Sequence, residues 1–260
     1  MIADLLLDTG AQPVIGHRGA SGSAPENTLA SFDLALEQGA EALEFDVRVT
    51  ADGVPVVCHD PTQDRTTDQT GPIRLATLAQ IRAADAGARF SLNGVDYPFR
   101  GREIRIPTLG EVLNRYRDVP LLIELKTVDG HQAIKEVLIG AEASGRVVLA
   151  SFADRALAPF RGTQFVVGAS RNDILRQRLT SWHLAGWRGR AVPQCFAVPY
   201  RYQDLIEVPT EGFIRSAHLV GSPVHVWTVN DPALAERLWG RGANGIITNF
   251  PGSIQRHRHQ

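Results

Sequence analysis

Short apolar segments alternate with segments of helical spacing along nearly all of this 260-residue chain. A strand–helix–strand order predicts parallel strands, because parallel neighbours need a crossover connection between them. The apolar segments that fit this order match in number the eight strands of an α/β barrel of about 250 residues; they lie near residues 14–17, 42–47, 121–126, 147–151, 164–169, 194–198, 224–229 and 245–248. The predicted fold class is therefore α/β, a single (β/α)8 TIM barrel formed by residues 1–260 as one domain.

One more apolar segment, residues 54–58, departs from this alternation. The connection before it, residues 50–53, is too short for a crossover helix and contains an Asp-Gly turn signal, so we expect a β-hairpin after the second strand. Pairing onward from this turn brings His59 back beside Asp46. The hairpin thus predicts that distant parts of the sequence share one mouth of the barrel.

Helical spacing of apolar residues predicts the remaining elements. Asn27 or Thr28 can cap the first helix, and residues 90–105 mix Gly, Pro, Tyr and Arg without a period. We therefore expect a small helical and loop excursion before the third barrel strand. The predicted helices lie at 29–38, 76–86, 108–116, 132–143, 154–160, 171–178, 203–207 and 232–240.

The charge balance limits the partners that the chain can have. With 27 basic and 28 acidic residues the formal net charge is −1, which offers no electrostatic footprint for nucleic acid or an anionic membrane. The N-terminus has neither a basic n-region nor a long apolar run, so we expect no stable membrane insertion and a cytoplasmic location. Cys58 and Cys195 both lie in apolar segments and are expected to be buried free thiols.

Histidines and acidic residues stand at the ends of the first strands. His17 follows the first strand, and Glu44 and Asp46 project from one face of the second. Two carboxylates on one face repel each other unless a cation or proton lies between them, and oxygen ligands favour Mg²⁺ or Ca²⁺. Glu124, inside another apolar strand, can supply a third carboxylate. These spacings predict a site for one divalent cation.

Two basic side chains lie near the same strand ends. Arg18 follows His17 in a loop before a helix, and a planar guanidinium suits bidentate contact with phosphate oxygens. Lys126 follows Glu124 and offers a second cation for phosphate. The C-terminal ends of barrel strands, where active sites lie, also bear Phe152 and Trp227. We predict that these four residues contact the substrate.

The motifs together resemble those of the glycerophosphodiester phosphodiesterase family, whose fold and site are similar to phosphatidylinositol-specific phospholipase C-like phosphodiesterases. The resembling segments span nearly the whole chain; they are His17-Arg18-Gly19, Pro25-Glu26-Asn27-Thr28, Glu44-x-Asp46-Val47, His59-Asp60-Pro61, Ile123–Lys126, Ser151-Phe152, Val226–Asn230 and Gly245–Pro251. The resemblance implies that Glu124 is a metal ligand, that Lys126 lies in the active site, and that Trp227 forms part of the wall against the substrate's glycerol moiety. This chain departs from the family in having Asn249 where Asp is common, which puts a charged role there in doubt.

The resulting hypothesis is metal-dependent hydrolysis of glycerophosphodiesters to sn-glycerol 3-phosphate and an alcohol. Histidine titrates near neutrality, so His17 and His59 can exchange protons with nucleophile and leaving group. The resemblance implies two steps, in which the substrate's own 2-hydroxyl attacks first and water then opens a cyclic glycerol phosphate. Direct attack by a metal-bound hydroxide is the competing route.

Two other functions fit the same sequence. A lysophospholipase D-type or cyclising lipid phosphodiesterase has a similar site, and the aromatic residues of loop 85–106, Phe90, Tyr97 and Phe99, could cover an acyl chain. A non-catalytic phosphate-binding barrel is the other alternative, since fold alone does not determine function. The sequence does not distinguish Mg²⁺ from Ca²⁺ and gives neither the alcohol head group nor the oligomeric state.

Overall fold

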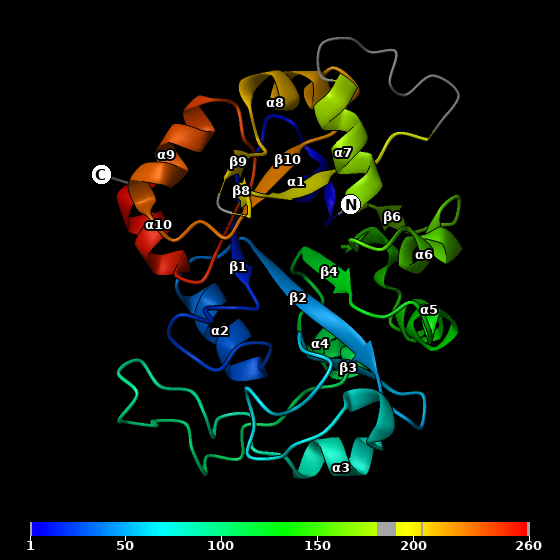
Figure 1. Ribbon diagram of the computed structural model, residues 1–260, viewed down its shortest axis with the longest axis vertical. Coiled ribbons are helices and arrows are strands. Elements are labelled where there is room, and N and C mark those ends of the chain that lie inside the picture. The colour runs from blue at the N-terminus through cyan, green and yellow to red at the C-terminus, as the bar shows by residue number, and fades with distance from the viewer. Residues whose placement is uncertain (1, 181–190, 204, 259–260) are drawn as a thin grey trace.

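The computed structural model of the chain describes residues 2–180, 191–203 and 205–258. Its centre is a curled parallel sheet with the strand order β6-β5-β4-β2-β1-β11-β10-β7 (Figure 1). These strands are β1 Val14–His17, β2 Ala42–Val49, β4 Leu121–Leu125, β5 Val147–Ala150, β6 Val166–Val167, β7 Phe196–Pro199, β10 Val224–Trp227 and β11 Ile246–Thr248. The predicted α/β class and parallel sheet are confirmed, and each predicted strand overlaps one of these.

Backbone hydrogen bonds join the two edges of this sheet. The Ala169 N–H donates to the Cys195 carbonyl at 2.9 Å, and the Gln194 N–H donates to the Val167 carbonyl at 3.1 Å. Val167 ends β6, Ala169 lies just beyond it, and residues 194–195 precede β7, so the sheet curls until its first and last strands meet.

Strand β3, Pro55–Val57, pairs antiparallel with β2, with Val47 opposite Val57. The Thr50 N–H donates to the Val54 carbonyl at 3.0 Å and closes the turn between the strands. Beyond the last pair, the Cys58 N–H donates to the Asp46 carbonyl at 3.0 Å. His59 therefore leaves the sheet next to Asp46.

Threonine side chains begin several of the helices. The Thr28 hydroxyl accepts from the Ser31 N–H at the start of α2, and Thr77 and Thr108 form capping boxes with Gln80 and Glu111. The helices are α1 Asp4–Leu7, α2 Leu29–Glu37, α3 Leu78–Ala83, α4 Leu109–Arg115, α5 His131–Gly140, α6 Asp154–Leu157, α7 Arg171–Thr180, α8 Glu211–His218, α9 Pro232–Gly240 and α10 Pro251–Arg258, with short 3-10 turns at Ile73–Leu75, Ala143–Gly145 and Ala158–Phe160.

The helix predicted at 203–207 is wrong. Residue 204 of that segment lies outside the described residues, and residues 206–207 form β9, Ile206–Glu207, which pairs antiparallel with β8, Arg201–Tyr202. Gln203 has a φ of +50°, which a right-handed helix does not contain. Helices α1, α8 and α10 were not among the predicted elements.

Side chains alternate between the two faces of the curled sheet. On β2, Leu43, Phe45 and Val47 pack toward the helices, so Glu44 and Asp46 project inward. Below them the interior is apolar and is closed by Leu6 of α1; this inner cluster also includes Ile15, Ala42, Leu122, Val148 and Ile247. Polar groups of the interior therefore collect at the C-terminal ends of the strands.

The segment between α3 and α4 lies at the lower left of the view (Figure 1), and Arg89 Nε donates to the Thr67 carbonyl in the loop after β3 at 2.7 Å. Phe90 and Phe99 pack edge to face there with ring centroids 5.3 Å apart, and the Arg100 guanidinium lies 3.8 Å from the centre of the Tyr97 ring.

Cys58 and Cys195 are buried and free, as predicted. Among the residues described, no helix combines the length and apolarity needed to cross a membrane.

His225 of β10 is fully buried and hydrogen-bonded on both ring nitrogens. Its Nε2 lies 2.9 Å from the Leu6 carbonyl, and its Nδ1 accepts from the Gly245 N–H at 3.0 Å. A Cβ at position 245 would lie 2.4 Å from that Nδ1, so only glycine fits there. The two bonds require the neutral ring, and burial lowers the pKa of His225 from 6.5 to about 4.

We expect this histidine to make folding sensitive to acid. Because its folded pKa lies below the unfolded value, the unfolded chain binds more protons between these pKa values. The stability is fully present above the unfolded pKa and falls as pH decreases, by about 2 kcal/mol between pH 7 and pH 5. Denaturant unfolding of wild type and His225→Gln at both pH values measures this, with the exposed His131→Gln as control. An equal pH dependence in wild type and His225→Gln would contradict the prediction.

Candidate active site

A cavity of about 150 Å³ opens at the C-terminal ends of the strands. It brings together residues of β1, β2, β4, β5, β7, β10 and β11 with residues of the loops that follow β3, β4 and β5. Most of the predicted site residues line it; the lining is His17, Glu44, His59, Leu122, Glu124, Lys126, Ala150, Phe152, Ala197, Trp227 and Ile247. Its floor is apolar and one wall is charged.

Three carboxylates converge beside this cavity. One oxygen each of Glu44, Asp46 and Glu124 lies within 4.8 Å of the others, because Asp46 and Glu124 are opposite one another in the β2–β4 ladder. Lys126 Nζ lies 2.8 Å from Glu124 and 3.2 Å from Asp46. The spacing along two strands has therefore placed all three acids on the inner face, as the alternation of side chains requires.

The pKa values of these three acids are shifted in different directions. Burial, followed by repulsion from Asp46 and Glu124, raises the pKa of Glu44 well above its usual value. Burial also raises the pKa of Glu124. Burial opposes ionisation of Asp46 as well, but the positive charges of Lys126 and Arg18 outweigh burial and hold the pKa of Asp46 below its usual value. Glu44 thus has an excess of negative charge around it.

The residues present fit a divalent cation. Hard oxygen donors are the ligands that Mg²⁺ and Ca²⁺ prefer, and a cation would remove the repulsion that raises the pKa of Glu44. Asp46 Oδ1 is buried and accepts no well-aligned hydrogen bond. Lys126 Nζ lies 3.2 Å from this oxygen, which keeps acceptor capacity for a further cation.

Arg18, in the loop after β1, contacts two of these acids. Its backbone N–H donates to Glu44 Oε2 at 3.0 Å, and its Nε lies 3.2 Å from Asp46 Oδ2. Its Nη1 donates to Glu26 at 2.9 Å. The residue has a φ of +54°, which turns the chain sharply after β1. The guanidinium is thereby fixed next to the acid cluster.

Asn249 holds His17 in the cavity. The Nδ1 atom of His17 lies 2.7 Å from Asn249 Oδ1, which also accepts from the Ser21 hydroxyl at 2.9 Å. With Oδ1 as acceptor, Nδ1 carries the proton and the Nε2 lone pair points toward Glu44, 4.0 Å away. Burial and then the charge of Arg18 lower the pKa of His17 to about 4. A neutral amide in this place orients the ring without adding charge.

His59 has an anionic partner instead. Its Nδ1 lies 2.7 Å from Asp60 Oδ1. Burial raises the pKa of Asp60, but hydrogen bonds from Arg65 and His59 outweigh it and lower that pKa to about 2. Arg48, on the inner face of β2, donates through Nε and Nη2 to the His59 carbonyl at 2.9 and 2.7 Å. The two histidines are therefore held by chemically different partners.

Aromatic rings form the other wall. Phe152 and Trp227 meet edge to face with centroids 5.8 Å apart. The Trp227 carbonyl accepts from the Tyr200 N–H at 2.8 Å, and Phe152 is 42% exposed at the mouth. Both residues therefore lie where the sequence predicts substrate contacts.

Sequence reasoning missed several residues that hold the site. Asn27, considered only as a helix cap, donates through Nδ2 to Asp46 Oδ2 at 2.9 Å and accepts from the Asp46 N–H at 3.3 Å. Arg48 and Arg65 were assigned no role. The signal for Asn27 was its place in the Pro25–Thr28 motif, whereas no sequence spacing marked the two arginines.

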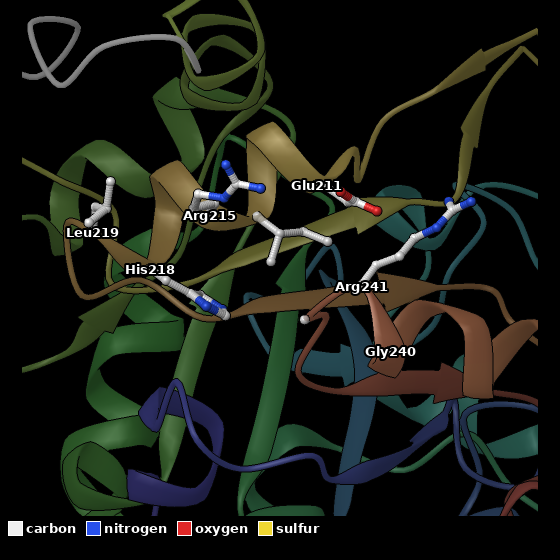
Figure 2. Close-up of a pocket in the computed structure, with 8 residues that line it drawn as sticks. Glu211, Arg215, His218, Leu219, Gly240 and Arg241 are labelled. Atoms are coloured by element: carbon white, nitrogen blue, oxygen red, sulfur yellow. The ribbon is translucent and has the colours of Figure 1, made fainter.

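A larger groove of about 500 Å³ lies elsewhere, between α8 and the end of α9. Figure 2 shows Glu211, Arg215 and His218 along α8, facing Gly240 and Arg241. Arg241 pairs with Glu207, and His218 Nε2 lies 2.7 Å from Asn244 Oδ1. The groove contains none of the predicted site residues.

Comparisons with known proteins identify one family of relatives. Residues 17–253 match the profile of the Glycerophosphoryl diester phosphodiesterase family. A protein named glycerophosphodiester phosphodiesterase from Caldanaerobacter subterraneus subsp. tengcongensis is 33% identical over 250 residues, which cover 93% of this chain and 95% of that protein.

Solved structures give the same result. The glycerophosphoryl diester phosphodiesterase domain of Mycobacterium tuberculosis Rv2277c has a TM-score of 0.80 at 25% identity, over 96% of this chain and 100% of that one. An Oleispira antarctica phosphodiesterase in complex with the product sn-glycerol-3-phosphate has a TM-score of 0.76 at 28% identity, over 97% and 98% of the two chains. The chain therefore belongs to the glycerophosphoryl diester phosphodiesterase family and is an enzyme of the phosphodiesterase class.

Proposed function

We propose that the chain hydrolyses glycerophosphodiesters to sn-glycerol 3-phosphate and an alcohol with the help of one divalent cation. The convergence of three carboxylates, two basic side chains and two histidines on one cavity carries this proposal. The product bound in the Oleispira antarctica enzyme supports the substrate class. A phosphodiester assay with glycerophosphocholine and added Mg²⁺ or Ca²⁺ tests it.

The carboxylates of Glu44, Asp46 and Glu124 would hold the cation. Bound there, a divalent cation supplies positive charge that neutralises the phosphate during attack. Arg18 and Lys126 add fixed positive charge beside the same oxygens, because their own positions are set by Asp46 and Glu124. The Phe152–Trp227 wall packs against the glycerol carbons and orients the hydroxyl groups.

The two histidines move the protons. One accepts the proton of the attacking hydroxyl, and the other donates to the departing alcohol oxygen. His17 presents a lone pair on Nε2 to the cavity, and the Asp60 carboxylate holds His59 through Nδ1. Both rings are thus oriented for transfer through the second nitrogen.

We infer that the glycerol 2-hydroxyl is the first nucleophile. A glycerol held against Trp227 keeps this hydroxyl next to the phosphorus, where intramolecular attack has a large effective-molarity advantage. The alcohol leaves in this first step, and water then opens the cyclic glycerol phosphate to give sn-glycerol 3-phosphate. The histidines exchange roles between the steps.

A 2-deoxy glycerophosphodiester is therefore expected to bind as a competitive inhibitor and to be cleaved at least about 10³-fold more slowly than the parent compound. ³¹P NMR of the reaction and an inhibition constant against the parent measure the two effects. Turnover of the deoxy analogue near the parent rate would establish direct attack by water.

A lysophospholipase D-type activity is the second candidate, since apolar side chains lie near the mouth. The Phe152 carbonyl accepts from the Arg171 N–H at 3.3 Å, and Arg171 Nη2 donates to the Tyr202 hydroxyl at 3.0 Å. Tyr202 ends β8; Leu205 and Ile206, at the start of the returning strand of the same hairpin, are 85% and 53% exposed. The β8–β9 hairpin would meet an acyl chain at the mouth, whereas Phe90, Tyr97 and Phe99 of loop 85–106 do not line the cavity.

Turnover of lysophosphatidylcholine relative to glycerophosphocholine separates these candidates. A non-catalytic phosphate-binding barrel would turn over neither compound. The single domain over residues 1–260, the cytoplasmic location and the absence of a nucleic-acid partner stay predictions.

A further inference from the structure

Arg65 joins two loops that belong to different parts of the active site. It lies in the polar loop after β3, and its Nε donates to Asp60 Oδ2 at 2.6 Å. Its Nη1 and Nη2 donate to the two oxygens of Glu26 at 2.6 and 2.7 Å. One guanidinium therefore bonds two carboxylates through three separate nitrogens.

Each of these carboxylates in turn holds a residue of the cavity. Asp60 uses its other oxygen for His59 Nδ1, 2.7 Å away. Glu26 Oε1 also accepts from Arg18 Nη1 at 2.9 Å, and Arg18 continues to Asp46. Hydrogen bonds and ion pairs thus connect a predicted proton-transfer residue to the acid cluster in the order His59, Asp60, Arg65, Glu26 and Arg18.

The contacts at position 65 require an arginine. Only a planar guanidinium offers donors in directions that reach both carboxylates at once, whereas an ammonium is a point charge on a flexible stem. Without the Arg65 guanidinium, the Asp60 side chain keeps its bond to His59 alone, and the Glu26 side chain keeps its bond to Arg18 alone. Either carboxylate could then rotate, and the residue that it holds would rotate with it.

We propose that Arg65 is a positioning residue that fixes the His59 ring and the Arg18 guanidinium relative to each other. This inference rests on the proposed phosphodiesterase function. Arg65 does not line the cavity and touches no reacting atom. Arg65 acts by keeping the side chains of His59 and Arg18, which follow different strands, in a fixed relative position.

The test compares Arg65→Ala with Arg82→Ala. Arg82 makes a similar ion pair with Glu111 at 2.7 Å, and the side chains of Arg65 and Arg82 are 49% and 46% exposed. We expect Arg65→Ala to lower kcat by about 10–100-fold, as the loss of a supporting partner does, with KM changed by less than about threefold. Arg82→Ala is expected to keep the wild-type kcat, and both variants to unfold at similar temperatures.

Chemical rescue separates positioning from a structural role. Half-exposed Arg65 leaves a site that solvent can enter, so added guanidinium is expected to raise the kcat of Arg65→Ala several-fold, whereas equal sodium does not. Arg65→Lys is expected to stay close to Arg65→Ala, because one ammonium cannot bridge both carboxylates. Wild-type kcat in Arg65→Ala, or a lowered kcat that guanidinium leaves unchanged, would overturn the proposal.

A second readout does not depend on turnover. The ¹⁵N resonances of the His59 imidazole report the hydrogen bond at Nδ1, and they are expected to shift in Arg65→Ala and to stay in place in Arg82→Ala. If the wild type hydrolyses no phosphodiester while this shift occurs, the proposed function fails and the positioning contact stands. Unchanged His59 resonances in Arg65→Ala would contradict the positioning role in either case.

Discussion

Removal of divalent cations by a chelator is expected to abolish phosphodiester hydrolysis, and readdition of Mg²⁺ or Ca²⁺ to restore it. Glu44→Gln, Asp46→Asn and Glu124→Gln are each expected to weaken cation binding by a factor on the order of 10²–10³, since loss of one partner of a buried charge pair costs about 3–5 kcal/mol. The physical reason is that three carboxylates within 4.8 Å of one another together balance a double positive charge. Titration calorimetry measures the affinities.

The cation-free protein provides an internal check on this interpretation. Burial and the neighbouring acids raise the pKa of Glu44, so its replacement by neutral glutamine is expected to leave the unfolding temperature unchanged or to raise it. Glu111→Gln, at an exposed ion pair with Arg82, is the control for an acid outside the site. Unchanged cation affinity in all three variants would refute this site, and a loss in only two would remove the third residue from the ligand set.

His17→Ala and His59→Ala are each expected to lower kcat by about 10²–10⁴, the usual contribution of a positioned acid or base. His17 ends β1 and pairs with Glu44 in the parallel ladder, and Arg48 holds the His59 carbonyl, so folding should stay intact without either side chain. Far-ultraviolet circular dichroism and the unfolding temperature verify this, and the exposed His131→Ala is the control for loss of a histidine elsewhere.

The double variant tests whether the histidines act together. If one takes a proton while the other gives one in the same step, removing the second ring after the first should cost little more. The kcat of the double variant is therefore expected to lie near the kcat of the less active single variant. A loss equal to the product of the two single effects would mean that the two rings act independently.

Much of the barrel could be predicted because its apolar strands are buried on both faces. Strand β2 could be predicted well, since alternation along it separates the helix-facing Leu43, Phe45 and Val47 from the inward acids. The 203–207 segment could not be assigned in the same way. Five residues are too few for a helical period, and the left-handed conformation of Gln203 is set by its hairpin rather than by local preference.

The candidate site was predictable where a strand fixes a side chain and not where a loop does. Glu44, Asp46 and Glu124 follow from strand periodicity and lie together in the structure. Asn27 reaches Asp46 only because a φ of +59° turns the chain before α2. Arg65 reaches Glu26 across 39 positions of sequence, a distance that no local pattern encodes.

Strand β2 places Glu44, Asp46 and Arg48 on one inward face, at every second residue. A single inserted or deleted residue within Ala42–Val49 would reverse the direction of all the side chains beyond it. Such a change would remove cation ligands and the support of His59 in one event, whereas a length change in residues 90–105 touches none of them. Selection for activity is therefore expected to preserve the length of β2, whereas residues 90–105 are not subject to this particular constraint.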